Sequence, residues 1–426
     1  MTIGIIGAGF TGLSAAYQLL KRGHSVTIFE RQNLPGGMAL GFEQPGWQWS
    51  LEEHYHHWFT NDAHILNLAK EIQFPVIVKR PKTSVYVDKK SYQLDSPQSV
   101  LSFPKLPFLE RLRMAAALGF LRYNPYWHAL EKFKATDVLP RMMGNLAYEL
   151  LWKPQLTSKF GRYIDDISLA WFWARVYKRT SSLAYPEGGF LRFAQALATT
   201  LNKLGAHILF TTEVQMIQYD NERVIVKTRN GIHTFDNVIV TLPSSLFVRI
   251  SPQLPPNYVH SLINLKGLGT INMVLRLNKQ FLSDNTYWLS VCDKTSAVMA
   301  VVEHTNFMEN RFYNNEHIVY LGNYVAPNHR YFHLKPADLL QVYHPFLKQL
   351  HPGYRNDIID YHVFRIPFAQ PIIPTNYSKI LPPHDTPLPC IYLANIQQVY
   401  PWDRGTNYAV ALGKTVVERM LEKTEG

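Results

Sequence analysis

A glycine-rich turn near the N-terminus constrains the fold of this chain more than any other feature. Residues Thr2 to Ile6 predict a short buried strand, and His24 to Glu30 predict a second strand with apolar side chains at alternating positions. Between them, Leu13 to Arg22 carries apolar residues at helical spacing. A strand, a glycine turn, a helix and a second strand in this order predict the first βαβ unit of a Rossmann-type parallel sheet.

The turn itself has the GxGxxG form of a dinucleotide-binding motif. It consists of Gly7, Ala8, Gly9, Phe10, Thr11 and Gly12. In such a motif the first glycine permits the tight turn, the second lets the backbone approach a pyrophosphate, and the third lets the helix pack on the sheet. The helix N-terminus presents free N–H groups to the phosphates. Glu30 ends the second strand, where a carboxylate accepts hydrogen bonds from ribose hydroxyls and would repel the 2′-phosphate of NADP.

A second glycine pair follows the second strand. Glu30-Arg31 is followed by Pro35-Gly36-Gly37, and this segment resembles the ExxxxxGG signature of the flavin amine oxidase superfamily. That superfamily includes protoporphyrinogen oxidases, phytoene desaturases, amine oxidases and, more distantly, UDP-galactopyranose mutases. The resemblance implies that FAD is the cofactor. It also places three groups along the cofactor: Arg31, the pair Gly36 and Gly37, and Met38.

Later segments extend the same resemblance. The stretch from Tyr185 to Val214 is similar to the family's return into the FAD-binding part, where the backbone at Val214 would contact the adenine. The segment from Leu393 to Ala409 is similar to the part of the family in which a helix N-terminus approaches the isoalloxazine ring. Further cofactor contacts implied in these regions are Pro243, Asn395, Arg404, Gly405, Thr406 and Asn407. No second complete GxGxxG motif occurs in the sequence, so a built-in NADPH domain is not expected.

The expected fold is α/β with two discontinuous parts. A Rossmann-type FAD-binding domain, with a parallel sheet and a β-meander, is expected from residues 1–80, 185–260 and 385–426. A mixed α+β substrate lobe is expected from residues 81–184 and 261–384, with a helical insertion at about 100–184. Alternating apolar residues predict a hairpin in residues 84–94 and a strand at 224–228.

Residues 51–62 form the densest unusual segment, LEEHYHHWFTND. The segment is loosely similar to the histidine loop of UDP-galactopyranose mutases, and we therefore predict that His54, His56 and His57 lie near the flavin or the substrate. A metal site is a rival interpretation because histidines and carboxylates bind zinc. The spacing is not HExxH, and we predict no metal. Histidines without a chemical role are the third interpretation.

Aromatic and basic residues in the second part predict the substrate contacts. The candidates are Trp171, Arg175, Arg365, Tyr400 and Trp402. Aromatic side chains there could clamp a flat or isoprenoid ligand, although a tryptophan-containing helical core would have the same pattern. Arg162, Arg175, Arg179 and Arg365 are candidates for a phosphate or carboxylate clamp, and each alone is also compatible with a surface charge.

Charge and hydropathy limit the partners and the location. The 43 basic and 32 acidic residues give a formal charge of +11, which suits an anionic membrane surface, an anionic substrate or a solvated basic face. We find no nucleic-acid-binding pattern and expect no nucleic-acid partner. With no signal peptide pattern and no apolar run of spanning length, we expect a cytoplasmic protein. The stretch Phe103 to Arg122 predicts a helix that either touches the inner face of the membrane or belongs to the core.

Three functional hypotheses follow. The first is an FAD-dependent oxidase, dehydrogenase or desaturase that transfers hydride from a hydrophobic or amphipathic small molecule to flavin N5, with oxygen or a quinone as the external electron acceptor. The second is a non-redox flavoenzyme of the UDP-galactopyranose mutase type, acting on a nucleotide sugar. The third is a flavin-binding assembly subunit without turnover.

Overall fold

The predicted strand–helix–strand unit forms the centre of a five-stranded parallel sheet. In the computed structural model, which describes residues 1–425, the strand order is β10-β2-β1-β14-β20. The bounds are β1 Thr2–Ile6, β2 Ser25–Phe29, β10 His207–Leu209, β14 Asn237–Val240 and β20 Ile391–Leu393. All four neighbouring pairs are parallel. The sheet therefore joins strands from the beginning, the middle and the end of the chain.

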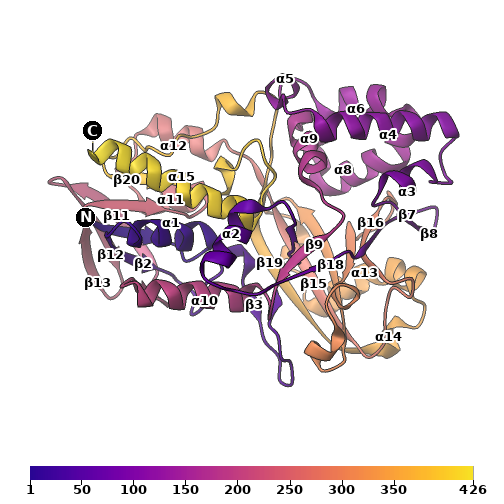
Figure 1. Ribbon diagram of the computed structural model, residues 1–426, viewed down its shortest axis with the longest axis horizontal. Helices are drawn as coiled ribbons and strands as arrows, with labels where there is room; N and C mark the ends of the chain where they lie inside the picture. The colour runs from indigo at the N-terminus through magenta and orange to yellow at the C-terminus, as the bar shows by residue number, and fades with distance from the viewer. Residues whose placement is uncertain (426) are drawn as a thin grey trace.

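Helices cover this sheet closely. Helix α1 (Phe10–Leu20) begins inside the glycine motif, earlier than the predicted Leu13, because Gly9 already takes the N-cap position. Helix α15 (Thr406–Glu425) runs along α1 (Figure 1). The two helices approach so closely that a Cβ at Gly413 would lie 2.5 Å from the carbonyl oxygen of Thr11. Helix α10 (Phe190–Lys203) also packs on α1.

The expected β-meander lies beside the parallel sheet. Its antiparallel strands are β11 (Val214–Asp220), β12 (Arg223–Thr228) and β13 (Gly231–Phe235). Its buried side chains pack in one core with those of β1 and β14 and with helices α11 (Ser244–Ile250) and α12 (Pro256–Ile263). The meander therefore belongs structurally to the dinucleotide-binding sheet.

A seven-stranded sheet forms the second layer, in the order β19-β15-β18-β17-β16-β7-β8. Its strands are β7 Lys82–Val87, β8 Lys90–Gln93, β15 Gly267–Leu277, β16 Thr286–Val291, β17 Ala300–Glu303, β18 His317–Val325 and β19 Ile358–Pro371. The predicted hairpin is confirmed as β7 and β8. Helix α13 (Pro336–Leu350) covers one face, next to α14 (Tyr354–Asp357), and the other face turns toward the parallel sheet.

A group of helices fills the upper right of Figure 1 and corresponds to the expected insertion. It contains α3 Pro97–Leu101, α4 Phe108–Tyr123, α5 Trp127–Leu130, α6 Ala135–Met143, α7 Asn145–Ala147, a π-helical turn Tyr148–Trp152, α8 Lys153–Phe160 and α9 Leu169–Lys178. Helix α4 begins at Phe108 rather than at the predicted Phe103. Pro107 takes the N-cap position, and Phe103 is buried in the preceding turn. Every helix in residues 1–425 is too short or too polar to span a bilayer.

Short elements connect the two layers. Strands β3 (Gly41–Phe42) and β4 (Leu51–Glu52) pair with each other, and β9 (Leu183–Pro186) lies between β5 (Trp58–Phe59) and β6 (Val76–Lys79). Helix α2 (Ala63–Glu71) follows β5. Single 3₁₀ turns occur at Gly37–Ala39, Gly161–Asp166, His304–Asn306, Asn310–Tyr313, Arg330–Phe332, Tyr377–Lys379 and Ile396–Gln398. The histidine-rich segment thus lies between β4 and β5.

Candidate functional site

The two glycine motifs form one cradle. A Cβ at Gly12 would lie 2.0 Å from the carbonyl oxygen of Gly7, which itself has a φ of +106°. A Cβ at Gly37 would lie 2.9 Å from the Cα of Gly9, and Gly36 donates its N–H to the carbonyl of Ala8 at 3.0 Å. The backbones of the two motifs are therefore in direct contact, and side chains at Gly12 or Gly37 would force this backbone apart.

The first turn of α1 is open to an anion. Gly9 is its N-cap residue, and within the described chain no side chain caps that turn. The N–H groups of the turn and the positive end of the helix dipole therefore face outward. Glu30 lies beside it: its Oε2 accepts from the Ala8 N–H at 2.8 Å and its Oε1 from the Gln32 N–H at 2.9 Å. Each carboxylate oxygen retains a lone pair for a ribose hydroxyl.

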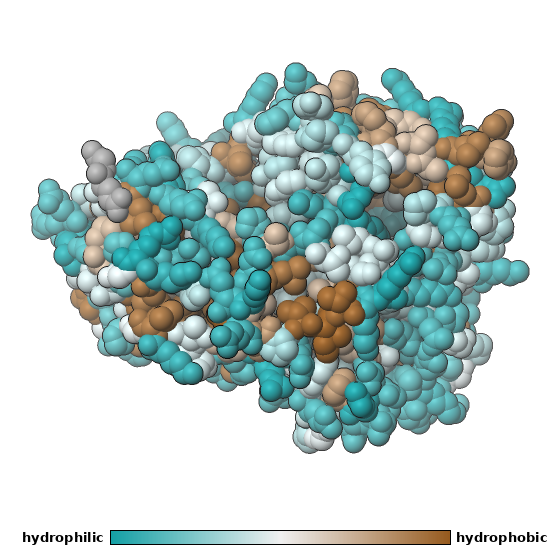
Figure 2. All heavy atoms as spheres, viewed as in Figure 1, coloured by the Kyte–Doolittle hydropathy of each residue, from teal (hydrophilic) through white to brown (hydrophobic). Residues whose placement is uncertain are grey.

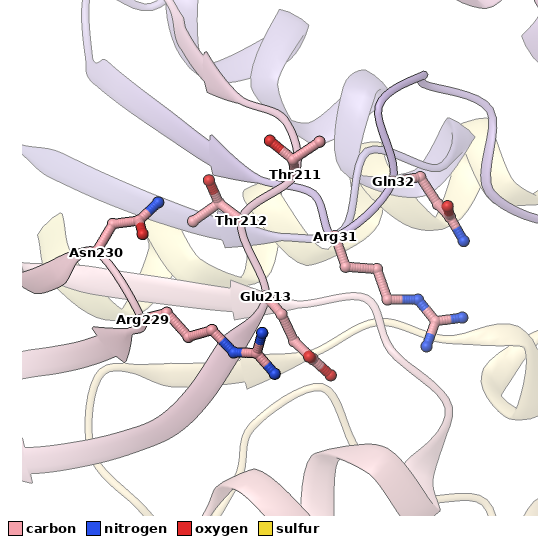
Figure 3. Close-up of a pocket in the computed structure, with 7 residues that line it drawn as sticks. All are labelled: Arg31, Gln32, Thr211, Thr212, Glu213, Arg229 and Asn230. Atoms are coloured by element: carbon pink, nitrogen blue, oxygen red, sulfur yellow. The ribbon is translucent and has the colours of Figure 1, made fainter.

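A cavity of about 510 Å³ lies next to Glu30. It is lined by Arg31, Gln32, Thr211, Thr212, Glu213, Arg229 and Asn230 (Figure 3). The side chains of Arg31, Glu213 and Arg229 project from three separate segments toward the same side. Val214, the predicted adenine contact, follows directly and begins β11.

The sequence did not indicate most residues of this cavity. Thr211 and Thr212 pair by backbone with the residues that follow β2, since their N–H groups donate to Gln32 O at 2.9 Å and to Glu30 O at 2.8 Å. Arg229 and Asn230 lie in the turn between β12 and β13. The Asn-Gly pair at 230–231 is a hairpin signal that could have located that turn.

The C-terminal motif fastens the start of α15 to the histidine segment. The hydroxyl of Thr406 accepts from the Trp58 indole at 2.8 Å, and Oδ1 of Asn407 accepts from the N–H groups of His64 and Ile65 at 2.9 and 3.1 Å. The two bonds to Asn407 provide an acceptor for N–H groups in the first turn of α2 that have no partner within the helix. The motif therefore holds three elements together at one point.

Other predicted cofactor contacts lie in turns around the cradle. Asn395 caps the turn Ile396–Gln398 and donates to the carbonyl of Leu242 at 3.1 Å. Pro243 is the N-cap residue of α11. Met38 is 37% exposed in the turn after the second glycine pair.

Burial keeps the three histidines neutral. The pKa of His54 falls to about 3, that of His56 to about 4 and that of His57 to about 3, because burial disfavours the charged ring in each case. His57 Nδ1 lies 3.1 Å from the hydroxyl of Tyr287, whereas His54 Nε2 is buried without a hydrogen-bond partner in the described chain. Among residues 1–425, no three His, Cys, Asp or Glu side chains group as metal ligands.

The histidine segment rests against the seven-stranded sheet. The Tyr55 ring lies 4.8 Å from that of Trp288 and 6.0 Å from that of Tyr320, edge to face in both pairs. The Tyr320 hydroxyl donates to the carbonyl of Glu52 at 2.8 Å, and the Asn272 side chain donates to that of Glu53 at 2.8 Å. The segment therefore packs on the sheet through Tyr55, and we call the cluster of Tyr55, Trp288 and Tyr320 the aromatic wall.

A second group of predicted residues meets around Asp403. Arg175 pairs with Asp403 Oδ2 at 2.6 Å, and the Trp171 indole donates to Oδ1 at 3.2 Å. Trp402, the residue before Asp403, stacks on Trp173 of the same helix as Trp171 and Arg175, with ring centroids 5.5 Å apart. The structure thus brings Trp171, Arg175 and Trp402 together, although Asp403 was not singled out from the sequence.

Two predicted substrate residues lie apart from that group. The Tyr400 hydroxyl donates to Glu131 Oε2 at 2.8 Å among the inserted helices. Arg365 lies on β19 and donates to the carbonyl of Leu334 at 2.6 Å. It pairs across the sheet with Ile271, whose side chain faces α13, so Arg365 lies on the face opposite the aromatic wall.

The parallel sheet, the double glycine cradle and the carboxylate of Glu30 beside it define a protein with a dinucleotide-binding fold. The chain belongs to the family of flavin containing amine oxidoreductases, whose sequence model matches residues 10–421. This membership confirms the family resemblance, the α/β fold class and FAD as the cofactor.

Individual relatives are distant. The chain is 25% identical over 275 residues to a 1-hydroxycarotenoid 3,4-desaturase from Flavobacterium sp. (strain P99-3), covering 56% of each protein. It is 26% identical over 300 residues to a coproporphyrinogen III oxidase from Staphylococcus aureus (strain NCTC 8325 / PS 47), covering 60% of this chain and 63% of the oxidase. These matches span between 56% and 63% of the relatives' own lengths.

The fold is shared more completely than the sequence. The solved structure of an oxidoreductase from Methanosarcina mazei superposes with a TM-score of 0.78 at 19% identity. The superposition covers 98% of this chain and 100% of that one. Both lobes of the fold are therefore common to the two proteins.

Proposed function

We propose that this protein is an FAD-dependent oxidoreductase that oxidises a hydrophobic or amphipathic small molecule. When bound, FAD supplies the hydride acceptor. The residues that would hold it are Gly7, Ala8, Gly9, Phe10, Thr11, Gly12, Glu30, Arg31, Gly36, Gly37, Met38, Val214, Pro243, Asn395, Arg404, Gly405, Thr406 and Asn407. They fit FAD for two reasons. The glycines carry no side chains that would keep a diphosphate from the backbone, and no side chain of the described residues caps the first turn of α1.

The aromatic wall is the observation that carries the substrate class. Tyr55 contacts both Trp288 and Tyr320 beside three neutral histidines, so aromatic rings and uncharged hydrogen-bonding groups surround this region. Such surroundings orient an apolar skeleton and exclude water. His54, His56 and His57 would position the substrate by hydrogen bonds rather than by exchanging protons near neutral pH.

The relatives support oxidation over isomerisation. Those described above are named as a desaturase and as a coproporphyrinogen oxidase, and both names denote oxidation of a carbon skeleton. The mutase alternative receives less support from them. An assembly role without turnover would leave the aromatic wall without a use.

A screen of the purified holoenzyme tests the proposal. Polyprenoids, porphyrinogens, amines and nucleotide sugars are added anaerobically, and the absorbance of the oxidised flavin is followed. We expect one hydrophobic or amphipathic class to bleach it, and readmission of oxygen or addition of a quinone then identifies the electron acceptor. A flavin that only nucleotide sugars perturb, and only after chemical reduction, would replace the proposal with the mutase function.

We also propose that α4 brings the enzyme to an anionic membrane surface. Apolar side chains gather on the exposed side of α4 and near its ends, at the upper right of Figure 2. Leu109 is 77% exposed, Tyr123 82%, Phe108 60% and Phe120 54%. The helix also carries arginines, and the whole chain has a formal charge of +11. Exposed aromatic and aliphatic side chains with basic neighbours suit the interface of an anionic bilayer.

A further inference from the structure

Lys159, on α8, is buried and makes no direct contact with a carboxylate of residues 1–425, although the charge of Asp403 acts on it. The residue is 8% exposed, and its Nζ lies 4.9 Å from the ring centroid of Tyr324, 5.0 Å from that of Trp171 and 5.8 Å from that of Phe160. No hydrogen bond or ion pair reaches this ammonium from residues 1–425. Aromatic faces attract a cation but do not neutralise it.

The groups around Lys159 add positive charge. The guanidinium of Arg404 lies 4.9 Å from the same Tyr324 ring, and its Nε donates to Gln370 at 3.0 Å. Asp403 is the neighbouring carboxylate. Arg175 and the Trp171 indole already bind its two oxygens. The Lys159 amine thus lies near two guanidinium groups and one carboxylate, and Arg175 and Trp171 already bind both oxygens of that carboxylate.

Such an arrangement is costly unless something compensates it. A lysine charge away from water is costly, so the buried amine tends to lose its proton unless a counter-charge is bound beside it. Burial, followed by repulsion from Arg175, lowers the pKa of Lys159 well below its usual value. A bound anion would reverse that shift, because it favours the charged amine.

We infer that Lys159, Arg175 and Arg404 bind the anionic head group of the substrate, a carboxylate or a phosphate. The inference rests on the proposed function and narrows its substrate to an amphipathic acid. The FAD diphosphate has a separate place in the fold: its cradle is at the N-terminus of α1, which packs with α15 and α10, whereas Lys159 is on α8, which packs with β16 and β18.

The position of Arg404 links the head-group site to the reaction site. Arg404 directly precedes Gly405 and Thr406, which begin the flavin motif of α15. Its charge influences both His54 and Tyr55, so it lies near the aromatic wall. An acid held by the three cations would extend its apolar part along that wall.

Anion titrations of the holoenzyme test the inference. Benzoate, inorganic phosphate and pyrophosphate are added separately, and tryptophan fluorescence and the oxidised-flavin spectrum are recorded; Trp171 is a reporter because its indole is bonded to Asp403. We expect saturable binding of at least one anion, and comparison of the three probes distinguishes a carboxylate from a phosphate. Lys159→Met should weaken it about tenfold or more, because a charge-assisted contact contributes that much, and Lys159→Arg should largely restore it.

Two further variants make the result specific. Lys153→Met is the matched control, since Lys153 is an exposed lysine on the same helix, paired with Glu149. It should leave anion binding unchanged. Asp403→Asn should tighten anion binding, because it removes the carboxylate that competes for Arg175, and it remains informative if Lys159→Met does not fold.

The inference is overturned if no probe binds saturably, or if Lys159→Met and Asp403→Asn both bind anions as the wild type does. The proposed function fails separately, when no organic substrate bleaches the flavin. Fluorescence reports anion binding without turnover, so the two failures are distinguishable.

Discussion

The ring of Tyr55 lies directly on the backbone of Gly322. A Cβ at Gly322 would stand 2.6 Å from Cε1 of that ring. Tyr55 belongs to the histidine segment, and Gly322 is in the middle of β18. Because Gly322 has no side chain, the Tyr55 ring packs directly on β18. The histidine segment therefore lies against the seven-stranded sheet.

We expect Gly322→Ala to push Tyr55 away from the sheet. Overpacking of this kind costs about 1–3 kcal/mol. Because the histidines flank Tyr55, the variant should also change the flavin absorbance and circular dichroism spectra. Gly119→Ala is the matched control, since a Cβ at Gly119 meets nothing within 4 Å. Equal stability and identical flavin spectra in the two variants would contradict the contact.

Gly12→Ala is expected to yield largely colourless protein. Its Cβ would lie 2.0 Å from the carbonyl oxygen of Gly7, so α1 must move away from the turn. A strain of about 1–3 kcal/mol on the binding turn lowers FAD affinity by about 5-fold to about 150-fold. The measurement is the dissociation constant of FAD, obtained by quenching of flavin fluorescence. Gly353→Ala, where a Cβ meets nothing within 4 Å, should retain the wild-type constant.

Glu52→Gln is expected to flatten part of the pH dependence of stability. Burial raises the pKa of Glu52 to about 7 from 4.5, although Tyr185 and the Phe190 N–H bind its carboxylate. The folded state therefore holds its proton more tightly than the unfolded state, so this stabilisation is present below about pH 4.5 and is lost as the pH rises to about 7. A shift of this size corresponds to about 3 kcal/mol.

Urea unfolding of the wild type and Glu52→Gln at several pH values measures this effect. The difference in the free energy of unfolding between the two proteins isolates Glu52 from the histidines, whose lowered pKa values act in the opposite direction. A difference that stays constant from about pH 4.5 to about pH 7 would show that Glu52 has an ordinary pKa.

Replacing exposed apolar residues of α4 should release the enzyme from anionic vesicles. Phe108→Ser with Leu109→Ser removes side chains that each contribute about 1.5–3 kcal/mol when buried. Sedimentation with vesicles of anionic or zwitterionic lipid measures the bound fraction. We expect the wild type to bind the anionic vesicles, the double variant to bind at least about tenfold more weakly, and Ile359→Ser, an exposed apolar position on β19, to behave as wild type. Equal binding of all three proteins would remove α4 from the membrane contact.

Local patterns predicted the parts of the site that are continuous in sequence. The turn from Gly7 to Gly12, the acid at Glu30 and the hairpin of β7 and β8 each follow from periodicity or spacing within a short window. The start of α4 was placed too early at Phe103, because Pro107 is the N-cap residue and Phe103 lies in the turn before it.

The head-group site could not be predicted in this way. Arg175 and Asp403 are separated by 228 residues, and Lys159 meets Tyr324 from another element. Their proximity depends on how the inserted helices pack against the second sheet. The position of Arg365 could not be predicted either. The face of β19 on which its side chain lies depends on the register with β15.

The central sheet has a consequence for biosynthesis. Strand β20 pairs with β14, about 150 residues earlier, and α15 closes over α1 almost the whole chain length away. Contacts between such distant segments form slowly, because a long loop must close before they can stabilise anything. On the ribosome, the N-terminal motif is made first but waits for its last neighbours, so tight coenzyme loading is a late event of maturation.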